Sequence, residues 1–271
     1  MGFPGAVALA LSTCLAVLAT DARAETVLIT GANSGIGLEF ARQYAARNWT
    51  VIATHRHAET PPTLTELSAR YPRVRAERMD VSSEQDVLAL AHKLEGVPID
   101  VLINNAAVYA EADGDPFTQS FGKFDFPLMD TIFAVNVKGP LMVVQAFYPN
   151  VKAGRQKKIV SISSTNGSLT HSPPGTNAVF YRASKAALNK EMQLIAQDLE
   201  PDGITVVLLH PGVVKTERFF ASSRKFNFGT ADNPAALDPA SSVQRMIATI
   251  DRLSLRKSGH FLRYDGSELP W

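Results

Sequence analysis

Short runs of β-branched and apolar residues alternate with helical patterns along most of this chain, and this alternation restricts its fold more than any other feature. The apolar runs predict strands over residues 26–30, 50–54, 74–79, 100–104, 157–163, 204–209 and 260–264. The stretches between them predict helices near residues 35–47, 83–95, 125–150, 179–200 and 236–253. Strands that alternate with helices of this length form βαβ units, in which helices cover both faces of a parallel sheet. We therefore expect a single α/β domain over residues 25–271, built as a three-layer, doubly wound parallel sheet.

The composition is that of an ordinary soluble globular protein, and it argues against several kinds of site. The 27 basic and 26 acidic residues give a net charge of +1, so there is no electrostatic case for nucleic acid. The single cysteine is Cys14, so residues 25–271 hold no disulfide and no thiolate metal site. His55 and His57 are interpreted as part of a solvated turn, with a fortuitous metal site as the alternative, and no zinc-protease spacing occurs. We expect no metal and no nucleic-acid partner.

Residues 1–24 differ from the rest of the chain. Residues 6–20 are apolar, and Ala22 and Ala24 are small residues at the two positions that a signal peptidase recognises. The apolar run is short for a membrane span, and no Lys or Arg precedes it. We interpret residues 1–24 as a signal-peptide-like or membrane-tethering leader, with a wrongly extended start as the alternative. Any contact with a membrane is expected only through this leader.

A glycine-rich stretch, TGANSGIG at residues 30–37, lies directly between the first predicted strand and the first predicted helix. Gly31, Gly35 and Gly37 allow a tight turn and a close approach of the backbone to a pyrophosphate, which the helix N-terminus attracts. The spacing is G-x-x-x-G-x-G rather than the commoner G-x-G-x-x-G, and a merely tight turn is the alternative. The position between strand and helix favours a dinucleotide site.

Tyr181 and Lys185 lie one helical turn apart in the helix predicted over residues 179–200. One interpretation is a half-buried tyrosine with an ordinary lysine beside it. The other is an acid–base pair, in which the ammonium lowers the phenol's pKa from about 10 toward neutrality. The choice depends on the residues elsewhere in the chain.

Taken in order, the motifs of this chain resemble those of the short-chain dehydrogenase/reductase family. They are TGANSGIG, NNAA (Asn104–Ala107), Asn136 in VNVKGP, SISS (Ser161–Ser164), YRASK (Tyr181–Lys185) and HPGVVKT (His210–Thr216). The match covers residues 25–271, and the ending FLRYDGSELPW is similar to the branch of C-factor-like proteins and small carbonyl reductases. The resemblance implies a Rossmann-type sheet and an NAD(P)-dependent oxidoreductase, which transfers a hydride between the nicotinamide cofactor and a carbonyl or secondary alcohol.

The resemblance also implies catalytic roles for particular residues. Tyr181 would be the general acid in carbonyl reduction and the base in alcohol oxidation. Lys185, with the positive nicotinamide, would lower the pKa of Tyr181 and bind the nicotinamide ribose. Ser164 would donate a hydrogen bond to the carbonyl oxygen, and Ser163 is its rival because neighbouring strand residues face opposite sides. Asn136 would hold a water that connects Lys185 to solvent, or would be a structural helix residue.

The cofactor contacts that the resemblance implies follow the ends of several predicted strands. They are Gly31, Asn33, Ser34, Gly35, Ile36, Gly37, Arg56, Asp80, Val81, Asn105, Ala106, Tyr181, Lys185, Pro211, Val213 and Thr216. No acidic residue ends the second predicted strand, where NAD-binding folds place one on the adenosine ribose. Arg56 stands there instead and can clamp a 2′-phosphate, although it also fits a solvated turn. Ser34 replaces a second basic residue that many NADP-preferring relatives carry. We favour NADP(H) over NAD(H).

Two long connections, residues 110–127 and 217–239, are expected to carry function. The second contains Phe219, Phe220, Phe226 and Phe228, which either border an apolar carbonyl or alcohol substrate or fill a satellite core. Residues 171–177 are expected to border the substrate pocket.

The function that competes with the enzyme is a catalytically weak, dinucleotide-binding signalling protein of the C-factor type. The complete set of Asn136, Ser164, Tyr181 and Lys185 argues against it, because a protein that only binds needs no general acid. The leader resembles an export signal, whereas the supply of cofactor favours catalysis in the cytoplasm. The sequence is compatible with a homo-oligomer.

Overall fold

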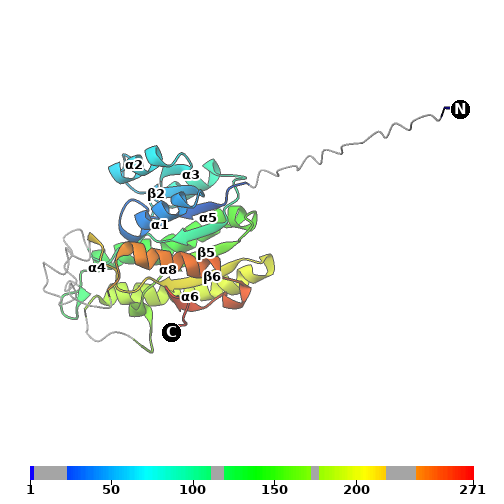
Figure 1. Cartoon of the computed structure of the whole chain (residues 1–271). Helices are drawn as coiled ribbons and strands as arrows, with labels where there is room; N and C mark the ends of the chain where they lie inside the picture. Colours follow the sequence, from blue (N-terminus) through cyan, green and yellow to red (C-terminus); the bar gives the residue numbers. More distant parts are fainter. Residues whose placement is uncertain (3–22, 111–118, 172–176, 218–235) are drawn as a thin grey trace.

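One parallel sheet forms the centre of the molecule (Figure 1). This computed structural model describes residues 1–2, 23–110, 119–171, 177–217 and 236–271. In that part of the chain, seven strands pair in the order β3-β2-β1-β4-β5-β6-β7. The strands are β1 (Thr26–Ile29), β2 (Thr50–His55), β3 (Val74–Arg78), β4 (Val101–Asn104), β5 (Lys158–Ile162), β6 (Thr205–His210) and β7 (Phe261–Arg263). Each predicted strand therefore exists, and the predicted doubly wound fold is confirmed.

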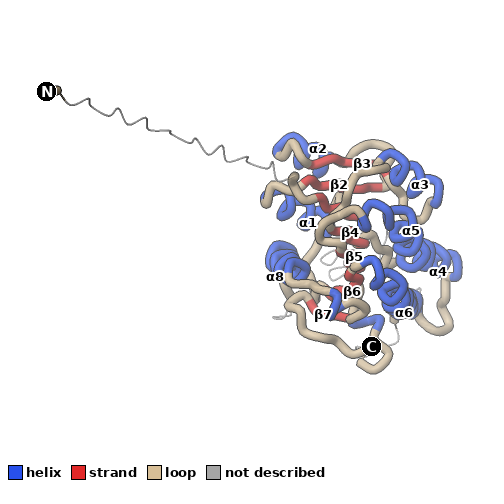
Figure 2. Tube along the Cα trace, turned by 90° about the vertical axis from the view of Figure 1, so that its right-hand side faces the viewer, coloured by secondary structure: helices blue, strands red, loops and turns tan. Residues whose placement is uncertain are grey.

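Helices cover both faces of this sheet (Figure 2). They are α1 (Gly35–Ala46), α2 (Pro62–Arg70), α3 (Glu84–Lys93), α4 (Phe126–Phe133), α5 (Gly139–Lys152), α6 (Val179–Leu199) and α8 (Pro239–Asp251). Buried side chains of α1, α2 and α8 share one apolar cluster with the sheet, and those of α3, α5 and α6 share another on the opposite face. The sequence patterns missed α2, because it buries only Leu64 and Leu67 and so carries little apolar periodicity.

The helix predicted over residues 125–150 is interrupted. Between α4 and α5 lies a short π-helix, η2 (Ala134–Lys138), with Asn136 at its centre. π-Helical turns are rare and often lie at functional sites. At the start of α5, a Cβ added to Gly139 would lie 3.0 Å from the carbonyl oxygen of Val81, so this helix begins tightly against the loop after β3.

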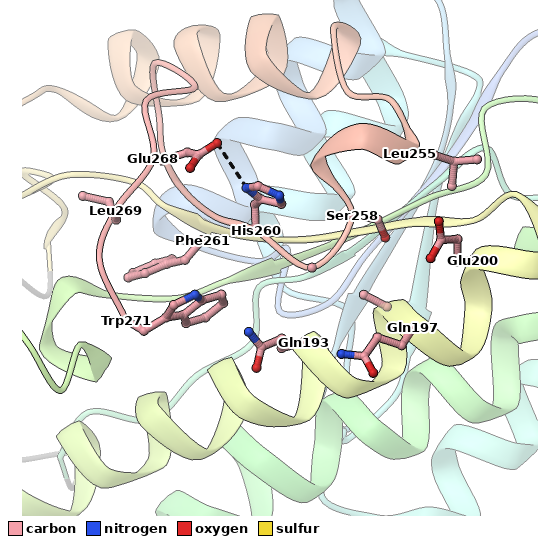
Figure 3. Close-up of a pocket in the computed structure, with 12 residues that line it drawn as sticks. Gln193, Gln197, Glu200, Leu255, Ser258, His260, Phe261, Glu268, Leu269 and Trp271 are labelled. Carbon is pink, nitrogen blue, oxygen red and sulfur yellow. Dashed lines mark ion pairs between the residues drawn. The ribbon is translucent and has the colours of Figure 1, made fainter.

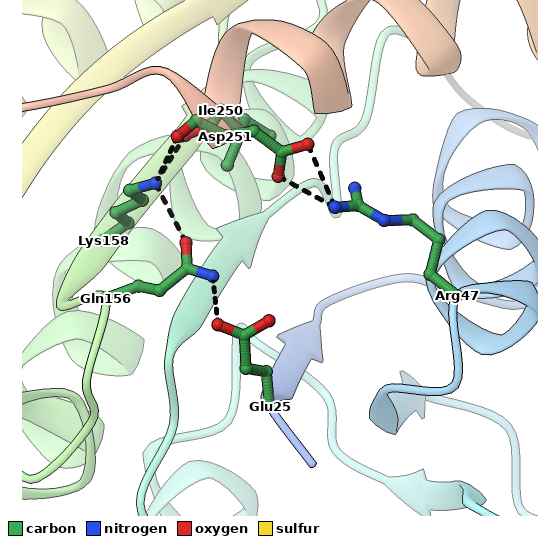
Figure 4. Close-up of polar contacts among 6 residues, drawn as sticks. All are labelled: Glu25, Arg47, Gln156, Lys158, Ile250 and Asp251. Carbon is green, nitrogen blue, oxygen red and sulfur yellow. Dashed lines mark hydrogen bonds and ion pairs between the residues drawn. The ribbon is translucent and has the colours of Figure 1, made fainter. Parts of the chain in front are cut away.

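A polar network ties together the amino-terminal edge of the sheet (Figure 4). Lys158, at the start of β5, is buried, and its Nζ donates hydrogen bonds to the carbonyl oxygens of Ile250 (2.7 Å) and Asp251 (3.1 Å). These carbonyls belong to the last turn of α8, so the ammonium caps that helix. The Asp251 carboxylate also pairs with Arg47 at 3.0 Å, and this contact joins α8 to the end of α1.

The outer edge of β7 is covered by the C-terminal tail. The Leu269 amide donates to the Phe261 carbonyl (2.8 Å), and the Arg263 amide donates to the Ser267 carbonyl (2.8 Å). The Trp271 ring stacks on Phe261 with 5.8 Å between the ring centroids. The tail therefore adds a short antiparallel partner to the last strand.

The segment after β2 differs from the expectation, and several other predicted segments lie outside the described residues. His55 lies inside β2 and is 3% exposed, so it is part of the sheet and the solvated turn begins only after it. The expectation for His55 was wrong because the strand runs one residue further than its β-branched run. The leader predicted over residues 1–24 falls mostly outside the described residues. The same is true of the four loop phenylalanines and of most of residues 171–177.

Candidate active site

The glycine-rich turn follows β1 and fits closely against the segment after β4. Gly31 and Gly35 have positive φ angles of 63° and 54°, a region that favours glycine. A Cβ on Gly37 would lie 2.4 Å from Asn105 Nδ2, so only glycine fits there without displacing that side chain. Asn105 Nδ2 itself donates to the carbonyl oxygens of Thr30 (2.9 Å) and Gly31 (3.1 Å). The NNAA segment thus fixes the shape of the turn.

The N-terminus of α1 begins directly after this turn and is open to an anion. Its N-cap, Ser34, makes no side-chain capping hydrogen bond, and no acidic residue lies in the first turn. The first amides of a helix lack intrahelical acceptors and carry the positive end of the helix dipole. A phosphate group of a dinucleotide therefore fits this end of α1.

Most of the predicted cofactor contacts line one cavity of about 500 Å³ at the carboxyl ends of the strands. They are Gly31, Asn33, Ser34, Gly35, Ile36, Gly37, Arg56, Asp80, Val81, Asn105, Ala106 and Thr216. Tyr181, Lys185, Pro211 and Val213 are not among its lining residues. Other residues of the lining were not predicted as cofactor contacts, namely His57, Met79, Ala107, Val108, Val135 and Glu217. Most of these directly follow or precede a predicted contact, and this adjacency is the signal that could have found them.

One end of the cavity lies beyond β2 and β3. Arg56 is exposed there, and His57 Nε2 lies 3.5 Å from Asn33 Nδ2. Asp80 Oδ1 accepts hydrogen bonds from the amide (2.9 Å) and hydroxyl (2.7 Å) of Ser82, which hold the carboxylate in place. This end therefore offers a guanidinium and an imidazole directly after β2, where an NAD-type site has a carboxylate.

The second functional group of residues lies where β5 ends and α6 begins. The Ser164 hydroxyl lies close enough to the Tyr181 phenol to lower its pKa by hydrogen bonding. Lys185 is 3% exposed, and its Nζ donates to the Ile162 carbonyl (2.9 Å) and lies 5.8 Å from the centroid of the Tyr181 ring. The structure thus brings Ser164, Tyr181 and Lys185 together.

The pKa values of this group are set mainly by burial. Burial raises the pKa of Tyr181 to about 12, although the Ser164 hydrogen bond lowers it. Burial lowers the pKa of Lys185 to about 8. Lys185 is not among the groups that shift the Tyr181 pKa, so the lowering that we expected from Lys185 together with the positive nicotinamide stays a prediction. A phenol with this pKa is protonated at neutral pH.

The two serines at the end of β5 have different surroundings. Ser163 is buried, and its hydroxyl donates to Asn189 Oδ1 (2.5 Å) on α6. Ser164 lies beyond the strand and contacts Tyr181. Of the pair, Ser164 is the residue that can reach a molecule bound at Tyr181.

The side chain of Asn136 is occupied by protein contacts. It accepts from the Val108 amide (2.8 Å) and donates to the Val108 carbonyl (2.8 Å) and to Ser184 Oγ (3.0 Å). Both amide hydrogens are therefore used, so in this arrangement the side chain fastens the segment after β4 to α6.

The loop after β6 approaches the glycine-rich turn. A Cβ on Gly35 would lie 3.5 Å from the Thr216 methyl group. Pro211 is buried, and its carbonyl accepts from Ser242 Oγ (2.7 Å), whereas Val213 is 39% exposed. Of the three predicted contacts on this loop, Thr216 is the one that lines the cavity.

A second cavity, of about 370 Å³, lies between α6 and the C-terminal tail (Figure 3). His260 Nδ1 pairs with Glu268 at 3.1 Å along one side, and Gln193 and Gln197 of α6 line another. None of the predicted catalytic or cofactor residues lines this cavity. The chemistry that the sequence predicts therefore lies at the carboxyl edge of the sheet.

The sequence profile of the short chain dehydrogenase family matches residues 25–225. The chain belongs to this family. This short-chain dehydrogenase is 33% identical to an uncharacterized oxidoreductase of Schizosaccharomyces pombe over 261 residues, which cover 90% of this chain and 96% of the relative. It is also 37% identical to C-signal of Myxococcus xanthus over 174 residues, which cover 64% of this chain and 93% of C-signal.

Solved structures support the same conclusion. The structure of NADPH-bound carbonyl reductase from chicken fatty liver matches with a TM-score of 0.77 and 30% identity, over 92% of this chain and 100% of that chain. The predicted family, and the resemblance of this short-chain dehydrogenase to C-signal and to carbonyl reductases, are thereby confirmed.

Proposed function

We propose that this short-chain dehydrogenase is an NADP(H)-dependent oxidoreductase that interconverts a carbonyl compound and a secondary alcohol. The observation that carries the proposal is the grouping of Ser164, Tyr181 and the buried Lys185, whose Nζ donates to the Ile162 carbonyl (2.9 Å) and lies 5.8 Å from the Tyr181 ring centroid. A tyrosine and a lysine that only packed together would not need a serine hydroxyl beside the phenol. The bound cofactor would supply or accept the hydride.

Each residue of this group then has a role that its surroundings support. Tyr181, protonated at neutral pH, would give its proton to the carbonyl oxygen during reduction. Ser164 would donate a hydrogen bond to the same oxygen as charge develops on it. Lys185 would hold α6 against β5 and contact the cofactor ribose. Asn136 would hold the π-helix against α6. A water that connects Lys185 to solvent would lie near Asn136.

NADP(H) is the cofactor that the cavity favours. Arg56 and His57 follow β2 within the lining, and the acidic residues of that lining, Asp80 and Glu217, lie on other loops. A guanidinium at this place suits a 2′-phosphate, whereas NAD sites use a carboxylate there. The chicken carbonyl reductase, whose structure resembles this one, is NADPH-bound.

The second candidate function is a signalling protein that binds the dinucleotide and turns over little substrate. The identity to C-signal favours it, although the aligned residues cover only 64% of this chain. The two candidates make the same prediction for NADPH binding and opposite predictions for turnover.

A panel of aldehydes, ketones and secondary alcohols, followed by NADPH and NADH absorbance, tests the proposal directly. We expect turnover with NADPH above that of the Tyr181→Phe variant, and a smaller rate with NADH. NADPH binding by calorimetry is the parallel measurement. Binding without turnover above Tyr181→Phe on any member of the panel would favour the signalling function.

A further inference from the structure

A buried glutamine connects the predicted general acid to the segment after β4. Gln119 is 0% exposed, and both ends of its amide are used. Its Nε2 donates to the Tyr109 carbonyl (2.7 Å), and its Oε1 accepts from the Tyr181 amide (3.0 Å). A fully buried side-chain amide is stable only where such partners exist, so these contacts fix Tyr109 and Tyr181 relative to each other.

The Tyr181 backbone is held from its other side as well. Ser184 Oγ donates to the Tyr181 carbonyl (2.7 Å) and accepts from Asn136 Nδ2 (3.0 Å). The Asn136 side chain in turn forms hydrogen bonds with the amide and the carbonyl of Val108. The hydrogen bonds therefore run from the segment after β4 through η2 and α6 and return through Gln119.

The ring of Tyr109 lies directly against the ring of Tyr181. Their centroids are 4.8 Å apart, and the planes are inclined by 68° in an edge-to-face arrangement. Tyr109 is only partly buried, so its ring keeps open surface. Its neighbours Ala107 and Val108 line the 500 Å³ cavity. Tyr109 thus directly follows a lining residue of the cavity, while its ring contacts that of Tyr181.

We propose that Tyr109 forms an aromatic wall of the substrate site and selects carbonyl compounds with an aryl group next to the carbonyl, with Gln119 as its positioning residue. The inference rests on the proposed function. A substrate that exchanges a hydride with a cofactor in the cavity and a proton with Tyr181 must lie between them, against Tyr109. Aromatic rings attract one another beyond their shared burial, which corresponds to a preference of about 2- to 10-fold.

Benzaldehyde and cyclohexanecarbaldehyde are matched probes of this wall, because they differ mainly in the aromaticity of the ring. The quantity to compare is the ratio of their kcat/KM values in the wild type and in each variant, since intrinsic reactivity cancels in that comparison. Tyr109→Leu should lower the ratio by about 2- to 10-fold. Tyr109→Phe keeps the ring and should keep the ratio. An equal ratio in the wild type and Tyr109→Leu would overturn the proposal.

The positioning role of Gln119 has its own test in Gln119→Glu. A protonated carboxyl group can reproduce both hydrogen bonds of the amide, whereas a carboxylate can accept from Tyr181 but cannot donate to the Tyr109 carbonyl. The aryl preference of this variant should therefore fall as pH rises through the carboxyl pKa, and that of the wild type should not. A pH-independent ratio, equal to that of the wild type, would remove Gln119 from this role.

Binding separates failure of this proposal from failure of the proposed function. Benzamide and cyclohexanecarboxamide, titrated into the NADPH complex and followed by cofactor fluorescence, report the wall without turnover. No turnover, with tighter binding of benzamide to the wild type than to Tyr109→Leu, would overturn the proposed function and keep the wall. Turnover of both aldehydes with no benzamide preference would overturn the wall alone. NADPH affinity checks that each variant is folded.

Discussion

Lys185 donates a hydrogen bond of 2.9 Å to the carbonyl oxygen of Ile162, and this contact joins α6 to the last residue of β5. Ser164 lies two residues beyond Ile162, and Tyr181 lies one turn before Lys185. This buried contact thus holds the end of β5, which carries Ser164, against the turn of α6 that carries Tyr181. The ammonium has a structural part in the site in addition to any part in catalysis.

Replacing Lys185 should therefore affect both turnover and cofactor binding. We expect Lys185→Met to lower kcat and to weaken NADPH, because it removes the contact to Ile162 and the charge beside the phenol. Steady-state kinetics and calorimetry measure the two effects. Lys190→Met, on the exposed side of the same helix, is the matched control. A variant that lost turnover but kept full NADPH affinity would contradict the double role.

Removing the Tyr181 hydroxyl tests the general acid. Tyr181→Phe should lower kcat by about 10²–10⁴-fold, the usual contribution of a positioned acid, and should leave NADPH affinity nearly unchanged. Tyr71→Phe, at a partly buried position on the α2 side, is the control for loss of a phenol. Wild-type turnover in Tyr181→Phe would mean that the tyrosine and lysine only pack together.

The high pKa of Tyr181 predicts a delayed ionisation. Because burial raises this pKa to about 12, the phenol should stay protonated as pH rises past the usual tyrosine value of about 10. Tyrosinate absorbance of the wild type and of Tyr181→Phe should therefore increase equally up to about pH 11. With NADP⁺ present, an extra tyrosinate in the wild type at lower pH would reveal the effect of the positive nicotinamide. An extra tyrosinate in the free protein below about pH 10 would contradict the burial effect.

Arg56 should discriminate between the two cofactors. Arg56→Ala should weaken NADPH by about 5- to 10-fold, a modest loss because the guanidinium is exposed, and should barely change NADH. Calorimetry with both cofactors measures the difference, and Arg256→Ala, exposed on another part of the surface, is the control. Equal losses for NADPH and NADH would remove Arg56 from the phosphate site.

Lys158 should matter more for stability than a lysine on the surface. Lys158→Met leaves the last carbonyls of α8 without their donor and should lower the free energy of unfolding by about 2–3 kcal/mol. Lys152→Met breaks exposed contacts, an ion pair with Asp202 and a hydrogen bond to the Tyr148 hydroxyl, and should cost much less. Denaturant unfolding gives both values. Similar losses in the two variants would mean that the cap on α8 contributes little.

Local patterns were enough to predict the strands, most clearly β1 and β6, whose buried residues read as nearly continuous apolar runs. They were enough to predict the glycine-rich turn as well, since its glycines fall between a predicted strand and a predicted helix. Helix α2 was missed because two leucines are its whole buried face. The π-helix at Asn136 was missed because it continues a helical pattern without a break.

The other features that the sequence did not predict depend on contacts between residues far apart in the chain. Gln119 is 62 residues from Tyr181, and no local pattern links them. The Tyr181 pKa depends on burial, which the packing of several elements determines together. The Tyr181–Lys185 spacing predicted an ammonium that lowers this pKa. In the folded chain, the Lys185 ammonium donates its hydrogen bond to the Ile162 carbonyl.

The tail that pairs with β7 has a consequence for how molecules of this protein meet one another. A strand at the margin of a sheet carries amides and carbonyls that can recruit a strand from another chain, and this is a common start of aggregation. Here the Leu269 amide donates a hydrogen bond to the Phe261 carbonyl, and the indole of Trp271 stacks on the Phe261 ring. The last residues of the chain therefore protect the edge strand from pairing with another molecule. Their removal would expose an aggregation-prone edge on an otherwise folded enzyme.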